Sequence, residues 1–286
     1  MHVPFSYLHK KRSMEFKGKT VLISGGSRGI GKAIALHLGK SGANVVIAAK
    51  TAEPHPKLEG TIYSAAEDII KAGGQAHAVM CDIREEDQVI NAVEETVKTF
   101  GGIDIVINNA SAINLSPTST LQMKTYDLMM DINVRGTFLF TKTALPHLKN
   151  STHPHILTLS PPLNLDPKWF SKHVAYTMSK YGMSMAALGF SEEYKKFGIA
   201  SNSLWPRTTI ATAAIMNIVG GEQMMKMSRH PEIMAEAAHE ILLRDPKVFT
   251  GNFCIDEDIL KEKGISNFDQ YRVDPNTPLM TDLFLD

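Results

Sequence analysis

The glycine-rich segment SGGSRGIG at residues 24–31 constrains the fold of this chain more than any other feature. It follows a short aliphatic run, TVLIS, that predicts a strand, and it precedes a stretch that predicts a helix. Gly25, Gly29 and Gly31 have the spacing G-x-x-x-G-x-G, which permits a tight turn and close backbone approach to a ligand. The helix N-terminus beyond offers unpaired N–H groups and a positive dipole end. The segment therefore predicts a site for the pyrophosphate of a dinucleotide rather than a plain glycine turn.

Short strands alternate with longer amphipathic stretches along the rest of the chain. Alternation of this kind, joined by right-handed crossovers, predicts an α/β fold with a Rossmann-type doubly wound parallel sheet of about seven strands. Strands are expected from Thr20, Asn44, Gln75, Ile103, His155, Ile199 and Asn252. Helices are expected near residues 29–40, 62–72, 85–100, 128–144 and 175–197.

No linker, repeat or low-complexity tract divides the 286 residues. We expect one domain over residues 14–286, with a helical lid near 207–243 and a C-terminal tail. Residues 1–13 match no predicted element and lack the apolar core of a secretion signal, so we expect them to be a poorly ordered extension.

Composition narrows the class of function. The formal net charge is zero, which indicates no bulk attraction to nucleic acid or to a membrane surface. No apolar run approaches the ~20 residues of a membrane-spanning helix. Cys81 and Cys254 are the only cysteines, and two distant cysteines form neither a disulfide framework nor a zinc site. We expect a protein without a bound metal in a reducing compartment: the cytoplasm or, in a eukaryote, the peroxisome or mitochondrion.

The end of the second predicted strand indicates which dinucleotide binds. An NAD site places a carboxylate there, about 20 residues after the glycine motif, to hold the ribose 2′-OH. Here the strand runs into Lys50, and the nearest acid, Glu53, comes later. Lys50 and Arg28 can instead pair with a 2′-phosphate, to which Ser27 can add a hydroxyl. We therefore favour NADP(H) over NAD(H), although Lys50 could also be a solvated lysine at a strand end.

Polar residues also follow the third and fourth predicted strands. Asp82 could accept a hydrogen bond from the adenine amino group. Asn109 and Ala110 follow the fourth strand, where the ligand crevice of an open sheet lies. Asp82 and Asn109 could instead be helix caps or turn formers.

Tyr176 and Lys180 lie four residues apart, which places them on one face of a predicted helix. A free phenol has a pKa near ~10, and a neighbouring cation lowers it. The pair can therefore act as a general acid and base near neutral pH. Two residues on a solvated helix face would give the same spacing.

These motifs together resemble the short-chain dehydrogenase/reductase family, in the family's order and from about Met14 to Gly251. The likeness also rests on Asn-Asn-Ala at 108–110, on Asn133 in DINVRG and on Trp-Pro at 205–206. Longer segments, among them LSPPLNL and PLMTDLFLD, resemble one subgroup of that family. The eukaryotic members of the subgroup carry a sterol-carrier domain after this region. We do not expect that domain within residues 1–286.

The resemblance implies an NAD(P)-dependent oxidoreductase that interconverts a carbonyl and an alcohol. Tyr176 would exchange the proton of the substrate oxygen. Lys180 would tune Tyr176 and bind the nicotinamide ribose, and Asn133 would hold a water in a proton relay. The predicted dinucleotide contacts are Gly25, Ser27, Arg28, Gly29, Ile30, Gly31, Lys50, Asp82, Ile83, Asn109, Ala110, Tyr176, Lys180, Pro206 and Thr209.

Two positions depart from the family pattern. Pro161 stands where the family has its substrate-orienting serine, so Ser160 is the candidate to replace it. Arg207 stands where the family has glycine after Pro206, and it could touch the cofactor phosphates or narrow the site.

A methionine-rich segment after Pro206 suits an adaptable apolar pocket, which predicts a small apolar carbonyl or alcohol substrate. Trp169, Phe170 and His173 are candidates for its mouth. The alternative is a nucleotide-binding redox sensor or scaffold with little catalytic activity, which Pro161 and Arg207 favour. By resemblance, we expect a homodimer or homotetramer.

Overall fold

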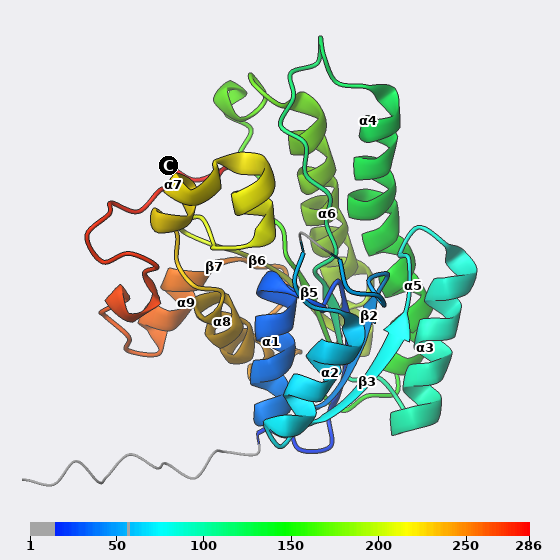
Figure 1. Cartoon of the computed structure of the whole chain (residues 1–286). Coiled ribbons are helices and arrows are strands. Elements are labelled where there is room, and N and C mark those ends of the chain that lie inside the picture. Colours follow the sequence, from blue (N-terminus) through cyan, green and yellow to red (C-terminus); the bar gives the residue numbers. More distant parts are fainter. Residues whose placement is uncertain (1–14, 56–57) are drawn as a thin grey trace, which may run out of the picture.

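Residues 15–55 and 58–286, which the computed structural model describes, are built around a sheet of seven parallel strands (Figure 1). Its strand order is β3-β2-β1-β4-β5-β6-β7. From β1 the chain adds β2 and β3 on one side, and then adds β4 and the later strands on the other side. The predicted doubly wound α/β fold is therefore confirmed. The extension expected over residues 1–13 lies outside the described residues. The strands are β1 (Thr20–Ser24), β2 (Asn44–Ala49), β3 (Gln75–Met80), β4 (Ile105–Asn108), β5 (His155–Thr158), β6 (Ala200–Trp205) and β7 (Phe253–Ile255).

The helices of the described residues are α1 (Gly29–Lys40), α2 (Ile62–Lys71), α3 (Glu86–Phe100), α4 (Met123–Met129), α5 (Thr137–Leu148), α6 (Val174–Glu193), α7 (Gly221–Lys226), α8 (Glu232–Leu242) and α9 (Asp256–Glu262). The helix predicted near 128–144 begins earlier and contains a π-helical turn at Met130–Gly136 between α4 and α5. Such turns often occur at functional sites. None of the helices in this part of the chain is long and apolar enough to cross a bilayer.

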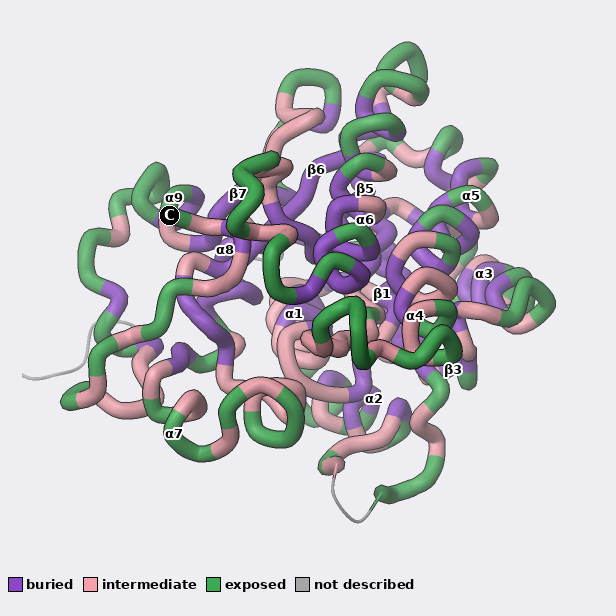
Figure 2. The backbone as a smooth tube through the Cα atoms, turned by 90° about the horizontal axis from the view of Figure 1, so that it is seen from above, coloured by how far each residue is buried: buried purple, intermediate pink, exposed green. Residues whose placement is uncertain are grey.

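Side chains of the strands alternate between two apolar cores, one on each face of the sheet. In β1, Val21 and Ile23 pack with residues of α1, α2 and α8, whereas Leu22 packs with residues of α3 and α5. Figure 2 shows that the central strands are buried along nearly their whole length. Because both faces are covered, the strands are almost continuously hydrophobic, which made them easy to recognise in the sequence.

The segment predicted as a helical lid, residues 207–243, has two parts. α8 packs against α1 and contributes buried side chains such as Ile233 and Ile241 to the core. The π-helical turn Ile215–Val219 and α7 consist of exposed and partly exposed residues (Figure 2). A lid could therefore be formed only by the residues before α8.

The C-terminal tail, residues 279–286, folds back along the segment that leaves β6. Thr209 N–H donates to Met280 O (3.0 Å), and Thr208 pairs with Thr281 in an antiparallel bridge. Phe284 is fully buried near the carboxyl end of the sheet. The tail is thus a structural element at the end of the sheet where ligands of doubly wound folds bind.

Candidate active site

The ends of β1 and β4 are tied together at the glycine turn. Ser24 Oγ accepts hydrogen bonds from the backbone N–H groups of Asn109 and Ala110, both at 3.1 Å. The Asn109 amide in turn donates to Ser24 O (3.0 Å) and Gly25 O (2.9 Å). Gly25 has φ +70°, and a Cβ at Gly31 would lie only 2.4 Å from Asn109 Nδ2. The close approach that requires glycine at Gly31 is therefore made by the protein's own asparagine.

The first turn of α1 is open to an anion. Arg28 precedes the helix without making a side-chain cap, and the first turn contains no acidic residue. Its N–H groups therefore remain available, and the helix dipole favours negative charge beside them. A cavity of about 360 Å³ borders this turn. The predicted dinucleotide contacts that line it are Gly25, Ser27, Arg28, Gly29, Ile30, Gly31, Lys50, Asp82, Ile83, Asn109 and Ala110.

Positive charge gathers where β2 ends. Arg28 donates from Nε to Glu59 O (2.9 Å) and from Nη2 to Gly60 O (2.8 Å). Because these acceptors are neutral carbonyls, they do not neutralise the guanidinium. Lys50 is exposed at the same edge of the cavity.

Asp82 forms an ion pair with Arg84, a contact that was not predicted from the sequence. Its carboxylate accepts two hydrogen bonds from the Arg84 guanidinium, at 2.9 and 2.6 Å, and one from the Arg84 N–H. The Arg84 side chain lowers the pKa of Asp82 below its ordinary value. Asp82 therefore closes the turn after β3 as an ion pair and still borders the cavity.

An apolar cavity of about 270 Å³ adjoins the first one. Ile30, Thr212 and Ala214 border both cavities. Tyr176, Pro206 and Thr209 also line the apolar cavity. The structure thus brings the tyrosine next to the glycine turn, although the two are about 150 residues apart in the chain.

Tyr176 and Lys180 are both buried on α6, but their electrostatics differ from the expectation. Lys180 Nζ donates to Leu159 O (2.6 Å) and lies 5.0 Å from the ring centroid of Trp205. Burial lowers the pKa of Lys180 to about 7. Burial and the nearby Asp282 raise the pKa of Tyr176 above its ordinary value. Lys180 therefore does not lower the pKa of the phenol in this arrangement, and its role in tuning Tyr176 stays a prediction.

Asn133 lies in the π-helical turn and joins two segments. Its Oδ1 accepts from Ala112 N (2.7 Å), and its Nδ2 donates to Ala112 O (2.9 Å) and Ser179 Oγ (2.9 Å). Ser179 Oγ donates to Tyr176 O at 2.9 Å. Asn133 therefore connects the loop after β4 to the turn of α6 that carries Tyr176.

Comparison with known proteins decides the family. Residues 19–222 match the family model described as short chain dehydrogenase. Hydroxysteroid dehydrogenase-like protein 2 of Danio rerio is 58% identical over 269 residues, which cover 94% of this chain and 64% of that protein. The Xenopus tropicalis protein of the same name is 60% identical over the same shares of the two chains. This chain belongs to the short-chain dehydrogenase/reductase family.

Solved structures agree with this assignment. A Xanthomonas campestris crystal structure is 52% identical with a TM-score of 0.92, covering 95% of this chain and 99% of that one. A short chain dehydrogenase of Mycobacterium thermoresistibile is also 52% identical, with a TM-score of 0.90 over 95% of this chain and 96% of its own. The predicted family and subgroup are confirmed. Short-chain dehydrogenases/reductases are oxidoreductases that bind nicotinamide cofactors. This chain spans less than two thirds of the length of its curated relatives.

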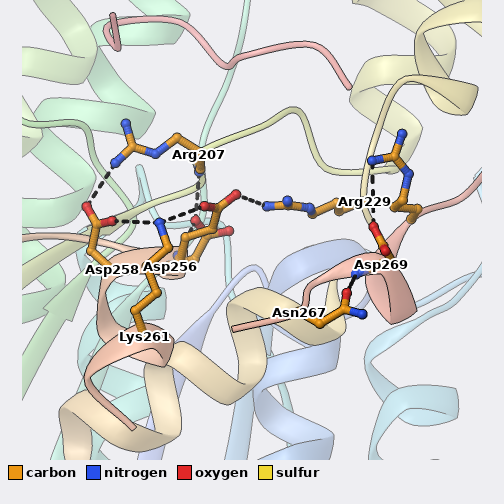
Figure 3. A network of polar contacts seen from close by, with 9 residues as sticks. Arg207, Arg229, Asp256, Asp258, Lys261, Asn267 and Asp269 are labelled. Carbon is orange, nitrogen blue, oxygen red and sulfur yellow. Dashed lines mark hydrogen bonds and ion pairs between the residues drawn. The ribbon is translucent and has the colours of Figure 1, made fainter. Parts of the chain in front are cut away.

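The positions that depart from the short-chain dehydrogenase pattern, Ser160-Pro161 and Arg207, line neither cavity. Ser160 is fully buried, and its hydroxyl has no hydrogen-bond partner among the described residues. A contact of Arg207 with the cofactor phosphates was one expectation, but its side chain lines neither cavity. Its side chain bonds Asp258 on α9 at 2.8 Å, and its N–H bonds Asp256 at 2.7 Å (Figure 3). The buried Asp256 carboxylate holds this segment and thereby directs the arginine outward.

The predicted pocket-mouth residues do not line the apolar cavity and pack instead in the aromatic cluster around Phe284. Trp169 and His173 have ring centroids 5.8 and 6.3 Å from that of Phe284, and Phe170 packs on Tyr181. In their place Met280, Asp282 and Leu283 of the tail line the apolar cavity. These tail residues were not predicted from the sequence, because a short segment after the last strand carries no periodic signal. An acidic residue within the apolar run PLMTDLFLD was the only hint.

Gly31→Ala tests the tie at the turn. A Cβ there would lie 2.4 Å from Asn109 Nδ2 and 2.7 Å from Gly25 O, so the turn must shift. We expect roughly 1–3 kcal/mol of destabilisation by overpacking. We also expect at least about ten-fold weaker dinucleotide binding in a fluorescence titration, because the N–H groups move. Gly102→Ala, where a Cβ meets nothing within 4 Å, is the matched control. Unchanged binding by Gly31→Ala would contradict this account.

Proposed function

We propose that this protein is an NADP(H)-dependent oxidoreductase that interconverts an apolar carbonyl compound and its alcohol, with Tyr176 as general acid and base. One observation carries the proposal: Tyr176 lines an apolar cavity that shares Ile30, Thr212 and Ala214 with the cavity at the glycine turn. A substrate beside Tyr176 would lie next to a dinucleotide held along α1. When bound, the nicotinamide would supply or accept the hydride.

The choice of NADP(H) rests on charge at the end of β2. Ser27, Arg28 and Lys50 border the cavity there, and they offer one hydroxyl and two cations to a 2′-phosphate. An NAD site would favour a carboxylate at this place. Asp82 is the acidic residue that lines the cavity, and its charge is paired with Arg84. A 2′-phosphate would therefore meet net positive charge.

The protonation state of Tyr176 suits proton donation to a carbonyl oxygen, as the reductive direction requires. Since burial and Asp282 raise its pKa, the hydroxyl is protonated at neutral pH and can donate to a carbonyl oxygen. Lys180 would hold the nicotinamide ribose if its ammonium left Leu159 O. In that position its charge would favour the phenolate that alcohol oxidation needs.

Asn133 supports this arrangement as a positioning residue. Ala112 and Ser179 use most of the hydrogen-bonding capacity of its side chain. It would therefore hold the Tyr176 helix against the loop after β4 rather than bind a relay water through its amide.

The buried state of Ser160 favours a second candidate. A nucleotide-binding redox sensor or scaffold would need no serine to orient a substrate, and the Ser160 hydroxyl is withdrawn from both cavities. Turnover of carbonyl compounds separates this candidate from the enzyme.

Tyr176→Phe tests the proposed acid. We expect NADPH oxidation with medium-chain aldehydes and ketones to fall by about 100- to 10,000-fold, because the proton donor is removed. NADPH binding should remain, and a fluorescence titration measures it. Equal turnover in the variant would exclude Tyr176 as the acid. Binding of NADPH without turnover of any carbonyl by the unmodified protein would favour the sensor or scaffold.

Lys50→Ala tests the choice of dinucleotide. We expect NADPH to bind roughly 10- to 100-fold more weakly, as for a lost charge-assisted hydrogen bond, and NADH binding to stay the same. Lys71→Ala, at the exposed end of α2, is the control for loss of a surface charge. Equal losses for NADPH and NADH would place Lys50 away from the 2′-phosphate.

We also propose a homodimer or homotetramer formed through α5 and α6, where Phe138, Met185 and Leu188 are exposed. Met185→Glu should reduce the mass in solution to that of one 31.5 kDa chain, because a charge would be buried at the contact. Val248→Glu, on an apolar residue outside these helices that is more exposed than Met185, should leave the mass unchanged. A monomeric unmodified protein in analytical ultracentrifugation would contradict the proposed assembly.

A further inference from the structure

The C-terminal tail forms one wall of the apolar cavity. Trp205 Nε1 donates to Leu283 O (2.9 Å), and Asp282 N donates to Arg207 O (3.1 Å). These bonds fasten the tail to the segment that leaves β6. The tail therefore holds a defined position beside Tyr176.

Phe284 anchors the tail from the other side. It is 1% exposed, and its ring centroid lies 5.2 Å from that of Tyr181, 6.0 Å from Trp205 and 6.2 Å from Tyr176. Phe284 has φ 70°, a conformation that is uncommon for a residue with a bulky side chain. Such a conformation persists where the surrounding packing imposes it. The aromatic packing thus also positions Asp282, two residues earlier.

Asp282 is the only charged side chain of the described residues that lines the apolar cavity. Its Oδ1 accepts one hydrogen bond, from the N–H of Leu283 at 2.6 Å. A carboxylate in apolar surroundings is costly unless hydrogen-bond donors reach it, and one backbone donor leaves most of its acceptor capacity unused. The carboxylate therefore lacks donors that a ligand in the cavity could provide.

The charged and titratable groups around Asp282 are Tyr176 and Lys180 on α6 and Asp256 on α9. Burial and, to a smaller extent, Asp256 raise the pKa of Asp282, while the Leu283 N–H and Lys180 lower it, and the net pKa is about 7. Lys180 Nζ itself bonds Leu159 O. The neighbouring protein groups thus stabilise the carboxylate only in part.

We propose that Asp282 accepts a hydrogen bond from a hydroxyl or amino group of the substrate and so orients it against Tyr176. This inference rests on the proposed function and narrows its substrate. The substrate is an apolar carbonyl compound or alcohol that carries a second hydrogen-bond donor. Above a pH of about 7, where Asp282 is mostly ionised, a substrate carboxylate is disfavoured because it would meet a like charge.

The test compares ketones of matched size in NADPH oxidation. Hydroxycyclohexanone isomers and aminocyclohexanone carry a donor, methylcyclohexanones carry none, and oxocyclohexanecarboxylate carries an anion. We expect kcat/KM of the unmodified protein to be roughly 10- to 100-fold higher for donor-bearing ketones than for methyl ketones, as for a hydrogen bond to a charged group. The hydroxyl and amino compounds show which donor the site takes.

Asp282→Asn should abolish this preference. Its amide oxygen can still accept from Leu283 N–H, but its N–H groups then face the cavity, so acceptor-bearing ketones such as the carboxylate should gain. Asp286→Asn, an exposed residue of the same tail that pairs with Lys168, should keep the original ranking. Thermal unfolding checks that both variants are folded.

Two outcomes are distinguishable. If ketones are turned over but the donor preference is absent, or is kept by Asp282→Asn, the role of Asp282 is wrong and the proposed function stands. If the unmodified protein binds NADPH and turns over none of these ketones and none of the medium-chain aldehydes, the proposed function fails and this inference fails with it.

Discussion

The tie between β1 and β4 is the contact on which the rest of the site depends. Ser24 Oγ holds two N–H groups of the loop after β4, and Asn109 returns two hydrogen bonds to the turn after β1. β1 and β4 are neighbours at the point where the order of the strands reverses. The ligand crevice of a doubly wound sheet lies at this point, so the tie sets where the crevice opens. It is possible only because Gly31 has no Cβ to meet Asn109.

The electrostatics of the tyrosine are set by burial rather than by its lysine. Lys180 is engaged by Leu159 O and lies over Trp205, so its charge does not support a phenolate in this structure. The tail adds the Asp282 carboxylate, which raises the pKa of Tyr176 further. Both effects keep the phenol protonated, which suits carbonyl reduction. A cofactor that drew Lys180 toward its ribose would shift this balance toward oxidation.

Local patterns were sufficient for most of the fold. β1, α1 and β2 begin and end at the predicted residues, because buried parallel strands are continuously aliphatic and the glycine turn marks the boundary between strand and helix. The π-helical turn around Asn133 was not predicted, since the apolar periodicity of the sequence does not distinguish it from α-helix, and its contacts with Ala112 and Ser179 join segments far apart in the chain. The outward course of Arg207 was also missed, because Asp256 and Asp258 lie about 50 residues later in the chain.

The sequence by itself determined the doubly wound sheet, the glycine turn at its first crossover and the family, because these depend on hydrophobic periodicity and on motifs within a few residues of one another. Only the tertiary structure decided which groups surround Tyr176. Burial, the direction of the Lys180 ammonium and the return of the tail with Asp282 and Phe284 depend on contacts between segments far apart in the chain. Such contacts change the pKa of a side chain without leaving any local pattern in the sequence.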